Sequence, residues 1–186
     1  VYMSWGKYDK AIEYYHQALA IGRKQKMEDE ISTFLNNIGE VHRNWGQYDK
    51  ALEYYQQALA IARRLGEEGG VAVYLNNIGL IYAFMGMHNK ANEYIQQALT
   101  IDQKLGRDAA IARDLSNIGV SFYAQKQYDS AIKHFSKSIN LIEKLRKTAV
   151  GDSRRDYLAS QIGNYHYIIA SYLQNLEPVN AFEAME

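Results

Sequence analysis

The chain has 186 residues, 47% of them hydrophobic and 23% charged, which is the ordinary composition of a soluble globular protein with a buried core. Lysine plus arginine equals aspartate plus glutamate at 21 each, so the zero net charge gives no electrostatic basis for binding nucleic acid or an anionic membrane. Cysteine is absent, which excludes disulfides and thiolate metal sites, and no run reaches the roughly 18 apolar residues that a membrane span needs.

Residues 1–6 do not form a signal peptide, because no charged segment is followed there by an apolar run. They match the middle of the repeat described next. We therefore expect this sequence to be a segment of a longer protein, and we expect a cytoplasmic location.

The segment Tyr8–Ile21 recurs 40 residues later as Tyr48–Ile61, and the two copies differ only at Ile12, which becomes Leu52, and at His16, which becomes Gln56. A second type of segment also repeats at intervals of 40. Its copies are Leu35–Gly39, Leu75–Gly79 and Leu115–Gly119. A fixed period of this length predicts an array of stacked supersecondary units.

Each unit is predicted to contain two helices, since small or apolar residues recur at i, i+3, i+4 and i+7 in both halves. In the repeat 27–66 these residues are Leu35, Ile38, Gly39 and His42, then Ala51, Tyr55, Ala58, Leu59 and Ala62. Glycines separate the helices where a positive φ is needed, at Gly46, Gly66, Gly86 and Gly106. Asp108 is the expected N-cap of the helix after Gly106.

The array is expected to fill the whole chain as one domain. Its predicted parts are a partial repeat 1–26, full repeats 27–66, 67–106 and 107–147, an irregular loop 147–156, and a partial final repeat 157–186 with a helix near 157–173.

Glycine inside a helix costs about 1 kcal/mol relative to alanine, so its recurrence predicts that two helix backbones approach closely there. The glycines are Gly39, Gly79 and Gly119, and the bulky residues expected opposite them are Tyr55, Ile95 and Phe135. A coiled coil would not place glycine every forty residues.

This pattern of Leu, Ile-Gly, aromatic, Gly-x-Tyr, Ala, aromatic and Ala resembles the tetratricopeptide repeat family over nearly the whole chain. His42 in an aromatic position, His88 in the tyrosine position and Lys126 in the glycine position depart from the pattern. The 40-residue unit is similar to that of kinesin light chain and of bacterial repeat proteins. The resemblance implies an all-α, right-handed superhelical solenoid of antiparallel helix pairs, whose concave groove binds a peptide. The end of the chain looks like the last repeat before a CHAT protease module.

A stripe on the first helix of each unit is predicted to line this groove, with one constant asparagine among variable neighbours. An asparagine amide can donate to a peptide carbonyl and accept from a peptide N–H, and the resemblance to kinesin light chain implies that role here. The predicted peptide-binding residues are Thr33, Asn37, Glu40 and Asn44, then Val73, Asn77, Leu80 and Phe84, then Arg113, Asn117 and Val120. The alternative is that the asparagines bond across neighbouring repeats and that Leu80 and Phe84 belong to the core.

The leading functional prediction is a non-enzymatic scaffold that binds a protein or peptide. The alternative is a regulatory or sensor arm, acting in cis, of a multidomain bacterial signalling protein or CHAT-type protease. Self-association through repeat ends is a third possibility. No metal or cofactor is expected, since the five histidines lack partners at ligand spacing. The glycine-rich segment 66–70 lacks the residues of a phosphate loop and is interpreted as a linker.

Overall fold

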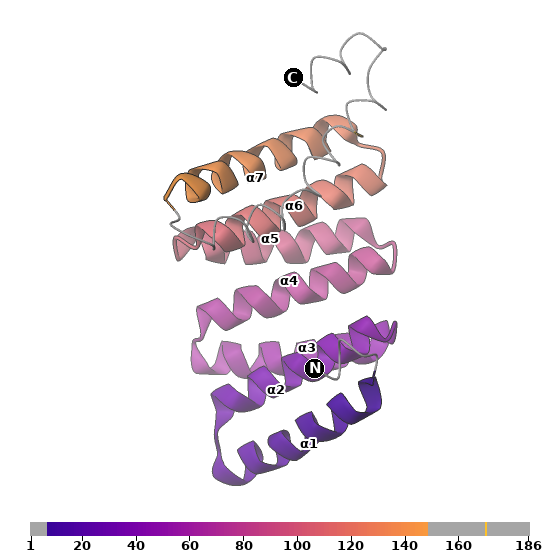
Figure 1. The fold of residues 1–186 in the computed structure, drawn as a ribbon, viewed down its shortest axis with the longest axis vertical. Coiled ribbons are helices and arrows are strands. Elements are labelled where there is room, and N and C mark those ends of the chain that lie inside the picture. Colours follow the sequence, from indigo (N-terminus) through magenta and orange to yellow (C-terminus); the bar gives the residue numbers. More distant parts are fainter. Residues whose placement is uncertain (1–6, 149–169, 171–186) are drawn as a thin grey trace. The chain divides into compact units, whose positions relative to one another are not determined.

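A computed structural model describes residues 7–148 and residue 170. Every regular element within residues 7–148 is an α-helix, which confirms the all-α prediction (Figure 1). The predicted helix near 157–173 and most of the loop 147–156 lie outside the described residues. The helices are α1 (Tyr8–Gln25), α2 (Glu28–Asn44), α3 (Tyr48–Leu65), α4 (Glu68–Phe84), α5 (His88–Lys104), α6 (Asp108–Ala124) and α7 (Tyr128–Thr148).

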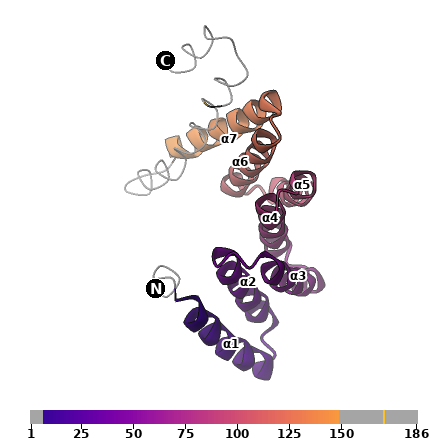
Figure 2. The same cartoon turned by 90° about the vertical axis from the view of Figure 1, so that its right-hand side faces the viewer.

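The chain divides into two compact units, Val1–Met87 and His88–Glu186. In the first unit α1 packs on α2, α2 on α3 and α3 on α4, and in the second α5 packs on α6 and α6 on α7. Within each unit, short turns make each helix antiparallel to the one before it (Figure 2). Consecutive helices in each unit therefore form antiparallel hairpins, as the repeat pattern predicts.

The turns between helices depend on a residue with positive φ. Gly46 (φ 76°), Gly66 (73°), Gly86 (76°) and Gly106 (65°) all adopt this conformation, as predicted. After α2, the Gly46 N–H donates to a carbonyl oxygen of the last helical turn and the next N–H donates to His42 O. These bonds satisfy carbonyl groups that would otherwise lack a partner at the helix end.

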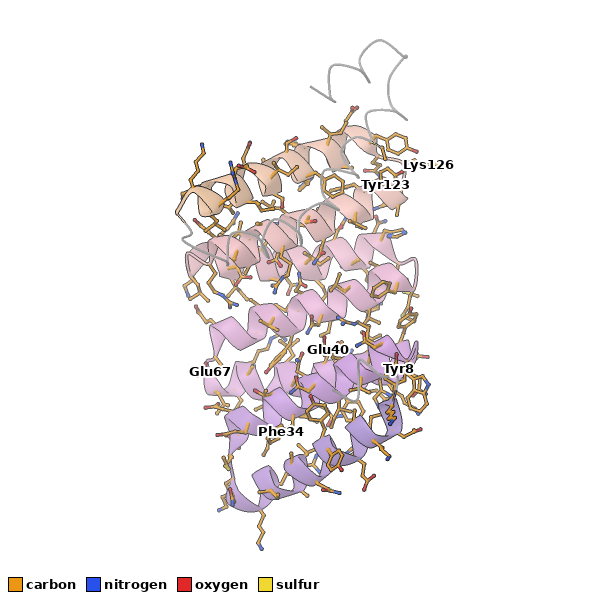
Figure 3. The ribbon with its side chains drawn as sticks, viewed as in Figure 1. Tyr8, Phe34, Glu40, Glu67, Tyr123 and Lys126 are labelled. Carbon is orange, nitrogen blue, oxygen red and sulfur yellow. The ribbon has the colours of Figure 1, made fainter. Side chains whose placement is uncertain are left out.

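Lys126 forms the same turn after α6 without the advantage of glycine. Its φ is 61°, its N–H donates to Tyr123 O at 2.9 Å, and the next N–H donates to Phe122 O at 3.0 Å (Figure 3). A side chain in this conformation brings Cβ close to backbone oxygen, which costs about 1–2 kcal/mol. The hydrogen bonds and the packing of α6 on α7 hold the residue there.

We expect Lys126→Gly to raise the free energy of unfolding by about 1 kcal/mol, because glycine removes this strain. Gly46→Lys is the matched reverse exchange and should lower stability by a similar amount. A Cβ at Gly46 would meet nothing within 4 Å, so its cost isolates the backbone effect. Urea denaturation of both variants measures the two changes. Equal stability of Lys126→Gly and the unsubstituted chain would contradict the prediction.

The predicted close approach of glycine to a bulky residue is confirmed in each unit. A Cβ built on Gly39 would lie 2.8 Å from Tyr55 Cδ1, and one on Gly119 would lie 2.7 Å from Phe135 Cε1. Both aromatic side chains are fully buried. Glycine is required at these points because no real Cβ fits at such distances.

Two details of the sequence prediction are wrong. Asp108 is the first residue of α6, and Arg107 occupies the N-cap position without a side-chain capping bond. The segment 66–70 is not a linker, because α4 already begins at Glu68 and Gly70 lies in its first turn. Hydrogen bonds such as Val71 N–H to Glu67 O start the helix despite the two glycines.

Candidate functional site

The predicted stripe lies at the surface of the first helices, α2, α4 and α6. The pattern of exposure repeats, since the outer members are mostly exposed and the middle members are half-buried. Phe84 is 58% exposed, which excludes the alternative that it belongs to the core. The exposed members are Thr33, Asn44, Phe84 and Arg113, and the half-buried members are Asn37, Glu40, Val73, Asn77, Leu80, Asn117 and Val120.

Three asparagines of the first unit form a hydrogen-bonded row that we call the amide ladder: Asn77, Asn36 and Asn37. The Asn77 Nδ2 donates to Asn36 Oδ1 at 2.8 Å, from α4 to α2. The Asn36 Nδ2 in turn donates to Asn37 Oδ1 at 3.4 Å. Each amide therefore fixes which way its neighbour points.

The ladder leaves complementary groups at its two ends. Asn37 accepts through its oxygen, so its NH2 is the donor at that end, whereas Asn77 uses one N–H and keeps its oxygen as an acceptor. The bond of Asn77 to Asn36 is the cross-repeat bond that the alternative prediction describes. It uses only part of the Asn77 amide, so the bond and a binding role are compatible.

Sequence reasoning missed Asn36, which joins the two predicted asparagines. Its signal was present in the doublet Asn36-Asn37 and its repetition as Asn76-Asn77. Only the second asparagine of the doublet persists in the repeat 107–147, where Ser116 precedes Asn117. The structure places Asn36 half-buried between its partners and Asn76 in the core.

Other stripe residues are held by local bonds on α2. Glu40 pairs with Arg43 at 3.1 Å, and the same guanidinium donates to Asn44 Oδ1 at 3.2 Å. Thr33 Oγ1 donates to the carbonyl of Asp29 at 3.2 Å. These surface pairs orient side chains but contribute little stability, because water screens them.

Aromatic rings gather where the first helix of each pair turns into the second. Phe84 stacks on Tyr48 with ring centroids 5.7 Å apart. His42, the departure from the aromatic pattern, is buried and stacks on Tyr54 at 5.3 Å. Burial lowers the pKa of His42, although its Nδ1 hydrogen bond to Gln47 at 2.9 Å opposes the shift. The neutral ring therefore replaces an aromatic side chain, which explains why the departure does not disturb the fold.

Charged side chains meet inside the second unit in a group that we call the charged quartet: Asp102, Arg107, Arg113 and Asp114. The side chains of Asp102 on α5 and Asp114 on α6 are fully buried. Arg107 Nη1 lies 3.2 Å from Asp102 Oδ1, and Arg113 Nη2 lies 3.2 Å from Asp114 Oδ1 and 3.8 Å from Asp102 Oδ2. Of these four residues the sequence prediction named only Arg113.

The quartet carries an altered acid. The pKa of Asp114 is raised to about 7, chiefly because the carboxyl is buried; Arg113 opposes this shift, and the neighbouring Asp102 carboxylate adds to it. A second negative charge beside the Asp102 carboxylate is unfavourable, so Asp114 holds its proton more tightly than an aspartate in water.

Over the residues that the structure describes, no helix is long and apolar enough to cross a membrane. Within the same residues no three His, Asp or Glu side chains are grouped so that they could hold a metal ion.

Comparison with known proteins gives the same fold. The tetratricopeptide repeat family matches residues 1–64, 30–104 and 71–144. BtubC (BKLC) from P. vanneervenii has a TM-score of 0.83 and 23% identity, with 98% of this chain and 70% of that chain covered. A putative kinesin light chain from Podosopora anserina has a TM-score of 0.73 and 18% identity, covering 99% and 86%.

A third similar structure is a Rap protein complexed with Competence and Sporulation Factor, with a TM-score of 0.72 and 18% identity. The alignment covers 98% of this chain and 57% of that one, so this chain spans little more than half of the Rap protein. No curated protein sequence matches. Identities this low establish the fold alone. The family matches, however, together cover residues 1–144, well over half of the sequence, and the chain therefore belongs to the tetratricopeptide repeat family.

Proposed function

We propose that this chain is a scaffold that binds an extended peptide segment of a protein partner across the first helices of its repeats. Repeats of this family generally serve as interaction scaffolds, and one similar structure is a Rap protein in complex with a factor. The amide ladder is the observation that carries the proposal. It offers a donor at Asn37 and an acceptor at Asn77, which are the two groups that a peptide backbone needs.

The position of the ladder supports this role. Asn37 and Asn77 are half-buried, so each is held in place by its neighbours and still reaches solvent. A polar group already oriented before binding loses little conformational entropy when the peptide arrives. The residues around the ladder differ from repeat to repeat, and they would select side chains. Exposed Phe84 is an apolar contact of this kind.

The same role is proposed for Asn117 on α6, which occupies the equivalent position of the second unit and is half-buried as well. Its neighbours Arg113 and Val120 differ in charge and size from those in the first unit. A partner segment contacting α6 is thus expected to carry different side chains from one contacting α2 and α4.

Peptides selected from a random phage-displayed library against this chain provide the probe for the experiment. We expect Asn37→Ala and Asn77→Ala each to weaken binding of a selected peptide by about 1–3 kcal/mol, measured by calorimetry, because a backbone hydrogen bond is lost. Gln56→Ala, at an exposed position on α3, is the matched control and should bind like the unsubstituted chain.

A second measurement separates backbone recognition from side-chain contacts. The selected peptide is N-methylated at one residue at a time, which removes one N–H donor and leaves the side chains. For one methylated position, the peptide should bind the unsubstituted chain weakly, and Asn77→Ala should not weaken its binding any further. Unchanged affinity of both asparagine variants for every selected peptide would overturn the proposal.

A further inference from the structure

The repeat 67–106 has an acidic residue at a helix-packing position where the other repeats have small or apolar residues. Asp102 on α5 stands 40 residues after Ala62 and 80 after Gly22. In the first unit that position packs against an aromatic ring, since a Cβ on Gly22 would lie 3.6 Å from Phe34 Cε2. Asp102 is completely buried, so this acid lies in the interior of the protein where the other repeats have a small or apolar residue.

The opposite side of the same contact has changed as well. Asp114 on α6 is the counterpart of Phe34 on α2 and Tyr74 on α4. Two acids thus stand where the earlier repeats have a small residue and an aromatic ring, which lie side by side in the first unit as Gly22 and Phe34. A protein with a buried charged group is usually less stable than one with well-packed apolar residues of similar volume at that place. Packing alone therefore does not account for the pair.

Two arginines neutralise the pair and extend from it to the surface. Arg107 and Arg113 are 36% and 42% exposed, although the carboxylates that they contact are fully buried. Arg113 reaches Asp114 through Nε and Nη2, at 3.3 and 3.2 Å. Its Nη1, with two further N–H groups, is not used in the contacts with either buried acid.

Both arginines line a pocket of about 640 Å³ in the second unit. Ala109, Ala110 and Leu145 contribute an apolar wall. The acidic group in the lining, Asp108, is paired with Lys144 Nζ on α7 at 3.2 Å. The cationic residues in the lining are Arg107 and Arg113, and the buried acids hold their guanidinium groups in position.

We propose that this pocket binds a carboxylate group of a peptide partner, with Arg107 and Arg113 as its ligands. The proposal rests on the proposed peptide-binding function and specifies the chemistry of the partner: an acidic side chain or a free C-terminus. Arginine suits the task because its planar fork matches both oxygens of a carboxylate.

The net charge of the charged quartet predicts that the protein takes up a proton when it binds a carboxylate. The quartet is neutral when both acids are ionised, and it carries one positive charge when Asp114 is protonated. In the pocket lining, the charge of Asp108 is compensated by its partner Lys144. An arriving carboxylate favours the form in which Asp114 is protonated, so the affinity should fall as pH rises from about 6 to about 8, on either side of the Asp114 pKa of about 7.

The probe is the peptide acetyl-Ala-Glu-Ala-Glu-Ala-amide, titrated into the ¹⁵N-labelled chain and followed at the Gly106 amide and the arginine Nε signals. The same peptide with glutamine in place of glutamate, and penta-alanine with a free C-terminus, distinguish side-chain from terminal carboxylates. We expect the glutamine peptide to cause no shifts. Arg113→Gln and Arg107→Gln should each weaken binding of the preferred carboxylate about tenfold, whereas Arg63→Gln, exposed on α3, should have no effect.

A further variant protects the test against loss of folding. Asp102→Ala, Arg113→Val and Asp114→Tyr together install the residues of the preceding repeat, Ala62, Val73 and Tyr74, which pack there without charge. This variant should stay folded and no longer bind the acidic probe peptide. Asn37→Ala should retain the probe, so failure of the peptide-groove proposal is distinguishable from failure of this one. Equal shifts with glutamate and glutamine peptides, or with Arg113→Gln and the unsubstituted chain, would overturn the carboxylate site.

Discussion

Gly119→Ala is expected to lower the free energy of unfolding by about 2 kcal/mol, even though alanine favours a helix by about 1 kcal/mol over glycine. The new methyl group would lie 2.7 Å from Phe135 Cε1 and 2.8 Å from Cδ1, closer than real side chains approach. Because the ring is fully buried, it has no open space into which it can move. The helices α6 and α7 would have to separate. Urea denaturation measures the loss.

Gly70→Ala supplies the control with the opposite sign. A methyl group at this position in α4 would lie 3.5 Å from Ala62 Cβ and 3.6 Å from Tyr74 Cε2, which is ordinary contact. The substitution should therefore raise stability by about 0.5–1 kcal/mol through helix propensity. Replacing the ring with the smaller side chain of Phe135→Leu should remove part of the stability loss caused by Gly119→Ala in the double variant. Simple additivity of the two losses would show that the methyl group and the ring do not clash.

Asp114→Asn is expected to make the chain more stable than the unsubstituted protein at pH 8, by about 2–4 kcal/mol. Burial raises the pKa of Asp114 to about 7, whereas an unfolded aspartate titrates near 4. The folded state thus binds a proton more tightly than the unfolded state. Stability from this group is fully present below about pH 4 and is lost as pH rises to about 7. Asparagine has no such loss.

The measurement is urea denaturation of both proteins between pH 5 and pH 8. The difference in unfolding free energy should be smallest at pH 5, grow in favour of the asparagine variant up to about pH 7, and then level off. Asp49→Asn, exposed at the start of α3, is the control and should follow the unsubstituted chain in parallel. Parallel profiles for Asp114→Asn as well would mean that the buried acid is ionised throughout this range.

The stability and binding predictions for Asp114 have one physical origin. Protonation of the buried Asp114 at low pH stabilises the folded chain, and the same proton gives the charged quartet a net positive charge. The pH range in which the second unit becomes less stable is therefore also the range in which its pocket should bind carboxylates less well.

The regular part of the fold could be predicted from the sequence alone. The 40-residue period, the helical spacing within each copy, and the glycines between helices located α2 through α7, because helices and turns depend on residues a few positions apart. The pairs Gly39–Tyr55 and Gly119–Phe135 were also predictable. Each pair lies within one hairpin, and the missing side chain of glycine signals close approach even without coordinates.

The two groups that bear on function required the tertiary structure. The amide ladder joins α2 to α4, and the charged quartet joins α5, the following turn and α6. The repeat alignment does show Asp102 and Asp114 in positions of small and aromatic residues, but it does not show that the two acids face each other. Partners of this kind are decided by which helix faces lie together and by rotamers at distances of about 3 Å. Sequence periodicity specifies the helix faces, and only the packed structure determines which side chains on them meet.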